Sequence, residues 1–346
     1  MRWKMCGCLL VVAVVALVLW GGQHAAQAQD DAALRSLKQL YKRPPPAKVE
    51  NAALVELGRL LFWDPRVSAS EKTACVTCHS PQLGWAVTDP RSRNDSGKLT
   101  SRKSPTLLGV GHFATGTPNG WDGRNATLEA QIKGSITTGS MSMRETETPV
   151  KVEVIEARIR AIPEYAKRFA AALPGKPVDL DGIAGAIAAY ERTFEPGPSP
   201  FDAWVAGNEG AISESAKRGF VLFNGKAVCV ACHSGWRLTD DKFHDIGTST
   251  KDLGRGSVAK TETEMQYAFK TPTLRSVALR PPYMHDGSSA TLEDVIRHYE
   301  KGGIDRPSRS PLMMPLSLTD QERRDLVAFM QALSGGPEGD TAPKLP

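Results

Sequence analysis

The residues best suited to chemistry in this 346-residue chain form two copies of the pattern Cys-x-x-Cys-His. The copies are Cys75-Val76-Thr77-Cys78-His79 and Cys229-Val230-Ala231-Cys232-His233. At this spacing two thiols can add to the two vinyl groups of one haem, and the histidine can bind its iron as proximal ligand. A single copy could be a chance match or half of a zinc site. Two copies favour a c-type cytochrome with two haem c groups, held by Cys75, Cys78, His79, Cys229, Cys232 and His233.

The N-terminus has the features of an export signal. Met1-Arg2-Trp3-Lys4 precedes an apolar run over residues 9–20, and Ala26-Gln27-Ala28 is a small-x-small cleavage site. The run is short for a membrane span, so we predict a signal peptide over 1–28, cleaved after Ala28. The alternative is an uncleaved anchor. Cleavage leaves no stable membrane anchor, and it removes both cysteines that lie outside the haem motifs.

The charge of the chain excludes one class of partner. The formal charge is +5, and loss of Arg2 and Lys4 with the acid-free leader lowers it to +3. This balance is too mild to indicate nucleic-acid binding. The mature chain is long enough for two domains of ordinary size.

Helical spacing of apolar residues dominates, and almost no sheet is expected, so the fold class is mainly α. Pro196-Gly197-Pro198-Ser199-Pro200 interrupts the pattern, and we predict a linker over 196–212 between an N-terminal domain, 29–195, and a C-terminal domain, 213–346. The expected helices cover 32–42, 47–62, 126–133, 149–172, 180–195, 213–224, 290–301 and 319–333.

The two halves repeat beyond the haem motifs. The paired segments, first half then second, are Ser104-Pro105-Thr106-Leu107 with Thr271-Pro272-Thr273-Leu274, Trp121-Asp122-Gly123 with His285-Asp286-Gly287, and Thr127-Leu128-Glu129 with Thr291-Leu292-Glu293. Two domains of one plan explain this pattern.

The repeat assigns different roles to the two haems. Tyr299 lies fourteen residues after His285 on an apolar helix face, where it is either a packed core residue or the second axial ligand of the second iron. His298 competes from the polar face, and Met284, Met313 and Met314 are weaker competitors. The equivalent residue in the first half, Ser135, is a poor ligand. His112 is the other candidate there, and a solvated loop histidine is the alternative for it. The first haem is therefore expected to be open to peroxide or oxygen, and the second closed.

In their order, the motifs resemble those of the bacterial di-haem cytochrome c peroxidase/MauG family over nearly the whole mature chain. The segments that carry the resemblance are Leu61-Phe62-x-Asp64-Pro65-Arg66, the two haem motifs, Ser104-Pro105-Thr106-Leu107, Trp121-Asp122-Gly123-Arg124, Leu128-Glu129-x-Gln131, Pro272-Thr273-Leu274-Arg275 and Pro282-Tyr283-Met284-His285-Asp286-Gly287. The resemblance implies two cytochrome-c-like helical domains, each with one covalently bound haem c.

The resemblance also implies roles for single residues. Trp121 would lie between the haems as an electron relay, and Gln131 would line the distal pocket of the first haem. At the position of Tyr299 typical peroxidases of the family have methionine, whereas MauG has tyrosine. The chain is therefore similar to the MauG branch, in which His79 and His233 would be proximal ligands and Tyr299 the distal ligand of the second iron.

Three departures from the family pattern stand out. Met141 replaces the usual distal acid, so proton transfer to peroxide would need Glu145, Glu147 or Gln131 with water. Lys103 replaces an asparagine that helps to bind calcium, and its ammonium could take the place of the ion. The first loop lacks the switchable distal histidine of the peroxidase branch, which agrees with a permanently open haem.

These features lead to one expected function and two alternatives. The expectation is a periplasmic enzyme that uses hydrogen peroxide at the first haem to oxidise residues of a partner protein, with tryptophan as the expected target. The first alternative is a cytochrome c peroxidase that takes electrons from a small c-type cytochrome or a cupredoxin. The second is an electron-transfer cytochrome without turnover.

Overall fold

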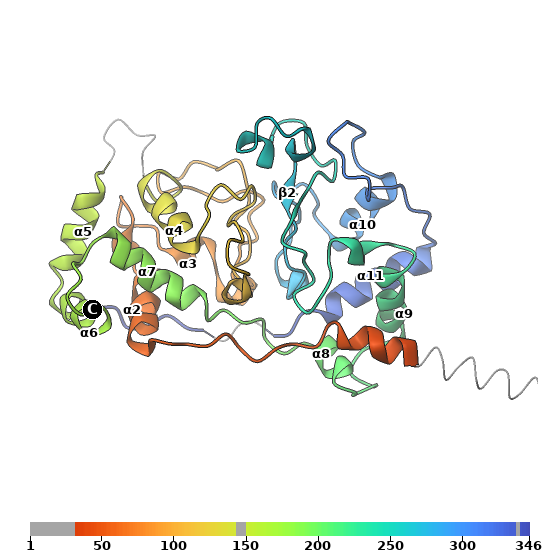
Figure 1. Cartoon of the computed structure of the whole chain (residues 1–346), viewed down its shortest axis with the longest axis horizontal. Coiled ribbons are helices and arrows are strands. Elements are labelled where there is room, and N and C mark those ends of the chain that lie inside the picture. Colours follow the sequence, from red (N-terminus) through yellow and green to blue (C-terminus); the bar gives the residue numbers. More distant parts are fainter. Residues whose placement is uncertain (1–31, 143–149, 337–339) are drawn as a thin grey trace, which may run out of the picture.

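The computed structural model describes residues 32–142, 150–336 and 340–346 as two lobes side by side (Figure 1). The expected signal peptide and both Glu145 and Glu147 lie outside these residues. The first lobe contains α2 (Ala52–Trp63), α3 (Cys75–Cys78), α4 (Leu128–Thr137), α5 (Val152–Arg160), α6 (Pro163–Ala172) and α7 (Leu180–Glu191). The second contains α8 (Pro200–Val205), α9 (Glu214–Asn224), β1 (Phe243–His244), β2 (Phe269–Lys270), α10 (Leu292–Lys301) and α11 (Asp320–Ala332).

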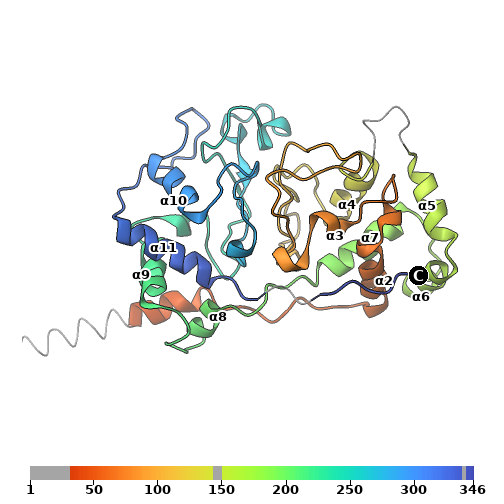
Figure 2. The same cartoon turned by 180° about the vertical axis from the view of Figure 1, so that it is seen from behind.

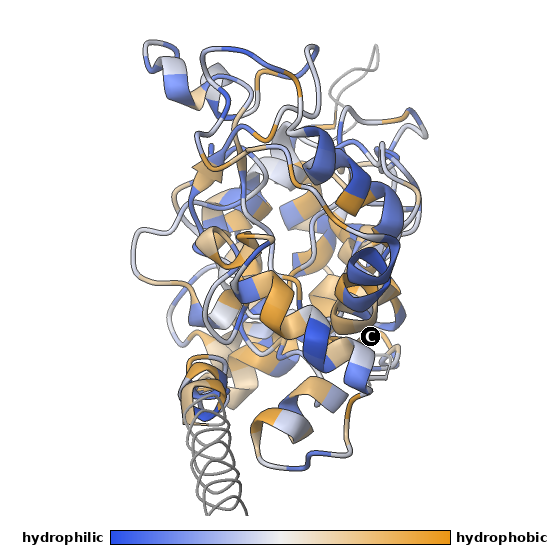
Figure 3. Ribbon diagram, turned by 90° about the vertical axis from the view of Figure 1, so that its right-hand side faces the viewer, coloured by the Kyte–Doolittle hydropathy of each residue, from blue (hydrophilic) through white to orange (hydrophobic). Residues whose placement is uncertain are grey.

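Each lobe is built around its own hydrophobic core. The first core draws on α2 to α7 and includes Phe62 and Ile187, and the second draws on α8 to α11 and includes Phe220 and Phe329. Figure 3 looks along the long axis from the second lobe and shows helices that carry both hydrophobic and hydrophilic residues. Such helices bury one side and leave the other in water. The prediction of a mainly helical fold is confirmed, because the strands β1 and β2 form only a short antiparallel ladder.

Local sequence explains where the helices begin and where the prediction of their bounds was wrong. The helix expected over 47–62 begins at Ala52, because the side chain of Asn51 caps it by accepting a hydrogen bond from the Leu54 amide. The helix expected over 149–172 is two helices, since Pro163 opens α6 and cannot continue α5. On α10, Thr291 and Asp294 form a capping box.

The same helix crossing occurs in both lobes. In the first lobe α2 crosses α7 where Gly58 meets the carbonyl group of Ala186, and a Cβ atom at Gly58 would overlap that oxygen. In the second lobe α9 crosses α11 where Gly219 meets the carbonyl group of Asp325 in the same way. Figure 2 shows both helix pairs from behind. The crossings extend the sequence repeat to residues whose similarity the sequence alone does not reveal.

The segment expected as a linker contains packed structure. Residues 200–205 form α8, which Ser199 caps together with Asp202, and Phe201 and Trp204 are fully buried in the second core. Proline favours the first turn of a helix as well as a loop, so the proline-rich pattern was ambiguous here.

The two ends of the described chain are exchanged between the lobes. The N-terminal end lies on the second lobe, and the C-terminal end lies on the first. The helix over residues 32–39 lies against the second lobe, where Tyr41 packs in the core and donates to Asn224 at 2.5 Å. The final residues lie against the first lobe, where Arg59 pairs with Asp340 at 3.0 Å and Arg66 donates to the Pro346 carbonyl at 2.9 Å. Figure 1 shows this crossing. Both ends therefore tie the lobes together.

The lobes meet through two reciprocal backbone hydrogen bonds. The Lys103 amide donates to the His285 carbonyl at 2.7 Å, and the Lys270 amide donates to the Trp121 carbonyl at 2.8 Å. In the sequence repeat Lys103 corresponds to Lys270 and Trp121 corresponds to His285. The interface thus has approximate two-fold symmetry, with the same contacts made in both directions. Among the described helices, none is both long and apolar enough to cross a membrane.

Candidate haem sites and the interface between them

The first motif lies on α3, a single helical turn. The His79 amide donates to the Cys75 carbonyl at 3.0 Å, and Nδ1 of the ring lies 3.1 Å from the Trp85 carbonyl oxygen. Burial lowers the pKa of His79 to about 4, so the ring is neutral. A neutral imidazole whose Nδ1–H donates to a carbonyl leaves Nε2 as the free nitrogen, which is the form that binds a metal.

The second motif repeats this geometry. The His233 amide donates to the Cys229 carbonyl at 2.9 Å, and Nδ1 lies 2.9 Å from the Leu238 carbonyl oxygen. Burial lowers the pKa of His233 as well. Both sites therefore prepare one imidazole nitrogen, Nε2, for an iron.

The cysteines of both motifs are free thiols, not disulfides. Burial raises the pKa of Cys229 to about 12 and that of Cys75 further still. Apolar surroundings of this kind disfavour the thiolates that zinc requires, whereas a neutral thioether suits them. The residues therefore fit haem c better than the zinc alternative.

A cavity of about 220 Å³ adjoins the second motif. Cys229, Cys232 and His233 line it together with Tyr299. Most of the remaining wall is apolar and includes Phe223, Leu274, Val295, Ile296, Leu326 and Met330. An apolar cavity with two thiols and an imidazole suits a covalently attached haem, and the phenol of Tyr299 is one of the groups that could reach its iron.

The structure separates Tyr299 from the histidine that competed with it. Tyr299 lines the cavity, and burial raises the pKa of its phenol. His298 points elsewhere on α10, with Nε2 2.8 Å from the Ile246 carbonyl oxygen. Met284, Met313 and Met314 also line the cavity, so their thioethers stay alternatives to the phenol.

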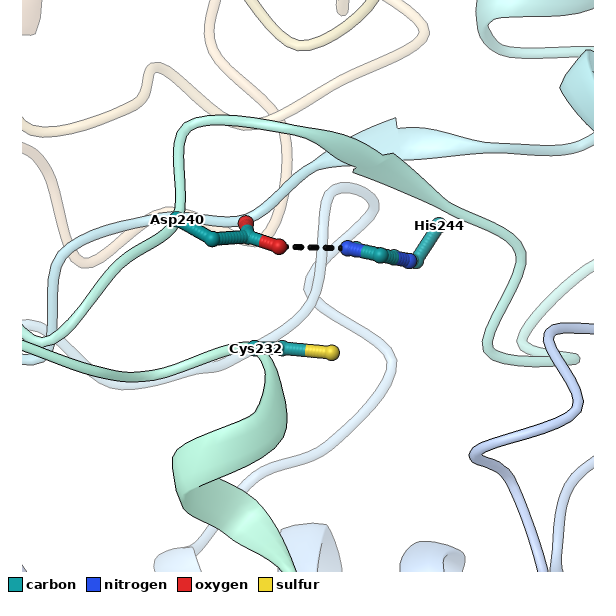
Figure 4. Close-up of side chains that lie close together, drawn as sticks. All are labelled: Cys232, Asp240 and His244. Atoms are coloured by element: carbon teal, nitrogen blue, oxygen red, sulfur yellow. Dashed lines mark hydrogen bonds and ion pairs between the residues drawn. The ribbon is translucent and has the colours of Figure 1, made fainter.

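A histidine and an aspartate lie beside the second cysteine of this motif. His244 Nε2 lies 2.8 Å from Asp240 Oδ2, and both side chains lie near the Cys232 sulfur (Figure 4). The hydrogen bond to Asp240 raises the pKa of His244 to about 9. A sulfur that forms a haem thioether is no thiolate ligand, so we assign no metal to this cluster.

The first lobe brings together fewer of the expected ligands. The Ser135 hydroxyl donates to the Gln131 carbonyl of its own helix at 3.1 Å. His112 is half-buried, with Nε2 2.6 Å from Glu195 Oε1, so it is neither solvated nor free to bind iron. Met141, at the position where an acid was expected from the family, is buried in the first core.

Gln131 lies next to the interface tryptophan. Its side-chain carbonyl oxygen accepts from Asn125 at 2.8 Å, and this oxygen would be 3.1 Å from a Cβ atom at Gly120. Trp121 follows Gly120 directly. The indole N–H of Trp121 donates to the Lys103 carbonyl at 2.7 Å, and the ring lines the same cavity as Tyr299.

Lys103 is 5% exposed, and its ammonium donates to the carbonyls of Arg280 at 3.2 Å and Pro281 at 3.0 Å. Burial lowers its pKa to about 8. No described carboxylate lies within ion-pair distance of this ammonium. Its carbonyl partners are of the kind that also bind calcium, which agrees with the hypothesis that the ammonium takes the place of an ion.

The sequence predicted no functional role for several residues around Trp121. His285 is 3% exposed and stacks on Phe269, with the two ring centroids 3.7 Å apart. Arg102 bridges the lobes, since it pairs with Asp122 and with Asp252, both at 2.6 Å. The repeat could have indicated His285 and Lys270, because they are the counterparts of Trp121 and Lys103. Nothing in the sequence links Arg102 to Asp252.

Two helical lobes of one plan, each with a Cys-x-x-Cys-His turn and an anchored imidazole, define a di-haem c-type cytochrome. Residues 52–210 match the family model described as di-haem cytochrome c peroxidase, and residues 216–334 match that of cytochrome c. The chain is 42% identical to the methylamine utilization protein MauG of Methylorubrum extorquens over 96% of each sequence. It is 33% identical to the cytochrome c551 peroxidase of Pseudomonas aeruginosa, over 84% of this chain and 81% of that one. The chain therefore belongs to the di-haem cytochrome c peroxidase family.

A solved structure supports the same assignment. The crystal structure of a MauG-like protein associated with microbial copper homeostasis superimposes with a TM-score of 0.75 at 29% identity, over 85% of this chain and 93% of that one. The family consists of haem-dependent, peroxidase-type oxidoreductases, and haem c is the cofactor that membership implies. Its two haem groups match the two motifs of this chain in number.

Proposed function

We propose that the protein is a periplasmic di-haem oxidoreductase of MauG type. It uses hydrogen peroxide at the first haem to oxidise residues of a partner protein, with tryptophan as the target, by long-range electron transfer. The observation that carries the proposal is the asymmetry between Tyr299, which lines the cavity of the second motif together with His233, and Ser135, which bonds to its own helix. Export to the periplasm follows from the leader expected over residues 1–28.

In this proposal the bound haems supply the iron that reacts with peroxide and carries charge. His79 and His233 hold the irons, and Tyr299 closes the second site against exogenous ligands. Trp121 provides an aromatic ring between the sites, and Gln131 offers an amide beside it. Glu145 stays a candidate for the acid–base group at the first site.

Addition of peroxide to the diferric protein tests the proposal. A change in the Soret band is expected, together with slow decay of the oxidised state when no partner is present. A Soret band that does not respond would favour the electron-transfer cytochrome without turnover.

The family name supports a second candidate, a peroxidase fed by a small c-type cytochrome or a cupredoxin. It predicts fast, steady oxidation of such a reduced donor by peroxide. The MauG proposal predicts little steady oxidation of the donor. Instead, a tryptophan of the partner is modified only when this protein is present, which mass spectrometry of the partner would detect.

Removal of one haem at a time tests the division of roles. Cys75→Ser with Cys78→Ser should remove the first haem and abolish the response to peroxide. Cys229→Ser with Cys232→Ser should leave a haem that binds ligands but does not share charge. If peroxide still reacts after loss of the first haem, the roles are assigned the wrong way round.

A further inference from the structure

Glu191 is a buried acid that the proposed function does not use. It is the last residue of α7 and is 4% exposed. Neither oxygen of its carboxyl group accepts a hydrogen bond from a residue that the structure describes, although neither oxygen is fully enclosed. Acidic side chains are almost never buried without a partner, because an unpaired charge in an apolar environment is costly.

The repeated helix crossing locates this carboxyl group. Ala186 and Asp325 occupy equivalent positions, since each presents its carbonyl oxygen to the glycine of the crossing helix. Five residues after Asp325 stands Met330, which lines the cavity of the second haem motif. Five residues after Ala186 stands Glu191. The first lobe therefore has a carboxyl group where the second lobe has a thioether against the haem cavity.

The electrostatics of the first motif agree with this position. Burial is the main cause of the raised pKa of Cys75, the first cysteine of the motif, and a negative charge on Glu191 raises it further. The acid and the expected thioether are therefore close enough to interact.

Neighbouring charges do little to stabilise an ionised Glu191. Burial raises the pKa of Glu191 to about 8. The positive charge of Arg192 lowers this pKa, and the negative charge of Glu129 on α4 raises it further. The Arg192 guanidinium is itself paired with Glu129 at 2.7 Å. On α2, Arg59 is paired with Asp340 at 3.0 Å and with Glu56 at 3.9 Å. The protonated, neutral form of the carboxyl group is therefore favoured at neutral pH, and a positive charge created nearby would favour the carboxylate.

We propose that Glu191 holds a redox-linked proton of the first haem site. When the haem on Cys75 and Cys78 is oxidised, one electron passes to the oxidant and one proton leaves Glu191 for solvent. The new carboxylate balances the positive charge left on the iron. On reduction, one electron and one proton return. The inference rests on haem attachment at the first motif, which is part of the proposed function, but it does not require peroxide as the substrate.

Redox titration of the holoprotein at several pH values tests the proposal, with the first haem followed by its own absorption bands. The midpoint potential of the first haem should fall as pH rises, by up to ~59 mV per pH unit. This slope corresponds to one proton per electron, since ~59 mV is a tenfold change in the equilibrium constant of a one-electron couple. Glu191→Gln should abolish most of this slope. Glu153→Gln is the matched control, because it removes an exposed acid of α5 in the same lobe and should leave the slope in place.

Infrared difference spectra between the reduced and oxidised protein give a second readout that needs no variant. Oxidation should remove the carbonyl band of a protonated carboxylic acid and produce a carboxylate band. A wild-type protein without these bands, or a pH slope that persists in Glu191→Gln, would overturn the proposal. A normal Soret response to peroxide in the same samples would show that the proposed function still stands.

Discussion

The indole ring of Trp121 and the imidazole ring of His285 lie edge to face across the interface between the lobes, with their centroids 6.5 Å apart and their planes at 72°. The two residues occupy equivalent positions in the sequence repeat. The backbone carbonyl of Trp121 accepts from the Lys270 amide, and that of His285 accepts from the equivalent Lys103 amide. The repeat-related turns therefore face each other, which brings an oxidisable ring to the interface between the two lobes.

This arrangement constrains how Trp121 can carry charge. Its indole N–H donates to the backbone carbonyl of Lys103, and a carbonyl oxygen cannot take up the proton that an oxidised indole would release. The ring is therefore suited to a brief positive charge and not to a stable neutral radical.

Trp121→Phe should weaken communication between the sites, because phenylalanine is harder to oxidise and lacks the N–H. We expect partner oxidation to fall roughly tenfold or more, equivalent to ~1.4 kcal/mol of barrier, while the two haems remain attached. Single-turnover kinetics after peroxide addition would measure this effect. Trp236→Phe is the control, since that ring contacts His112 instead, with the centroids 4.7 Å apart. Equal rates in wild type and Trp121→Phe would show that charge takes another path.

The buried ammonium of Lys103 predicts a pH dependence of stability. Burial lowers its pKa to about 8 from an ordinary value of 10.5. Between these values the unfolded chain binds more protons than the folded one, so the free energy of unfolding should rise as pH increases from about 8 to 10.5. Below pH 8 the ammonium is charged in both states, so the full cost of burying the charge lowers the free energy of unfolding.

Lys103→Met isolates this contribution. The variant should be at least as stable as wild type near neutral pH and should lose that advantage as pH rises through the same interval. Denaturant unfolding at each pH provides the measurement. Lys242→Met, at an exposed position on the second lobe, is the control and should follow wild type. An advantage that stays constant with pH would mean that Lys103 is not a charged group in the folded protein.

The helix crossings make a prediction about glycine. Gly58→Ala should destabilise the first lobe by about 1–3 kcal/mol, because the new methyl group overlaps the Ala186 carbonyl oxygen and forces α2 away from α7. Gly185→Ala, on α7 with no atom within 4 Å of the added Cβ, should instead stabilise by roughly 0.5–1 kcal/mol through helix propensity. Thermal unfolding would show opposite shifts, and similar shifts in the two variants would contradict the crossing.

Features that depend on local spacing could be predicted from the sequence, whereas features that depend on tertiary packing could not. The haem motifs and the inward face of Tyr299 were accessible because each depends on spacing within one turn or one helix. Glu191 was not, since nothing local distinguishes a buried acid at a helix end from a solvated one. The reciprocal bonds of Lys103 and Lys270 depend on how the lobes meet, which spacing within one segment does not encode.

Two of the misjudged elements contain proline. Pro163 begins a new helix, and Pro200 opens α8 inside what was expected to be a linker. Proline signals the first turn of a helix as strongly as it signals a break, so only the packing of Phe201 and Trp204 decides between the two. The crossing of the chain ends is likewise a tertiary feature, because Tyr41 and Asp340 find partners far away in sequence.

The last prediction concerns Tyr299, which lines the cavity together with His233. In the protein alone, burial raises the pKa of the phenol, so it is protonated at neutral pH. A ferric ion at bonding distance would be the largest local charge and would reverse this effect, which makes the phenolate the bound form. An anionic ligand stabilises ferric iron more than a neutral one and should keep the potential of the second haem low.

Tyr299→His should therefore keep the second haem six-coordinate and low-spin but raise its potential, because imidazole is neutral. The oxidised state after peroxide should become harder to form, and partner oxidation should drop with it. Tyr299→Phe should open the second haem or recruit water. His298→Ala is the matched control on the same helix, and its spectrum should equal that of wild type, since His298 is held by the Ile246 carbonyl. Electron paramagnetic resonance and absorption spectra of the second haem would distinguish these outcomes. A second haem whose spectrum is the same in Tyr299→Phe as in wild type would assign the ligand to one of the neighbouring methionines, and it would remove the main reason to prefer a MauG-type reaction over that of a cytochrome c peroxidase.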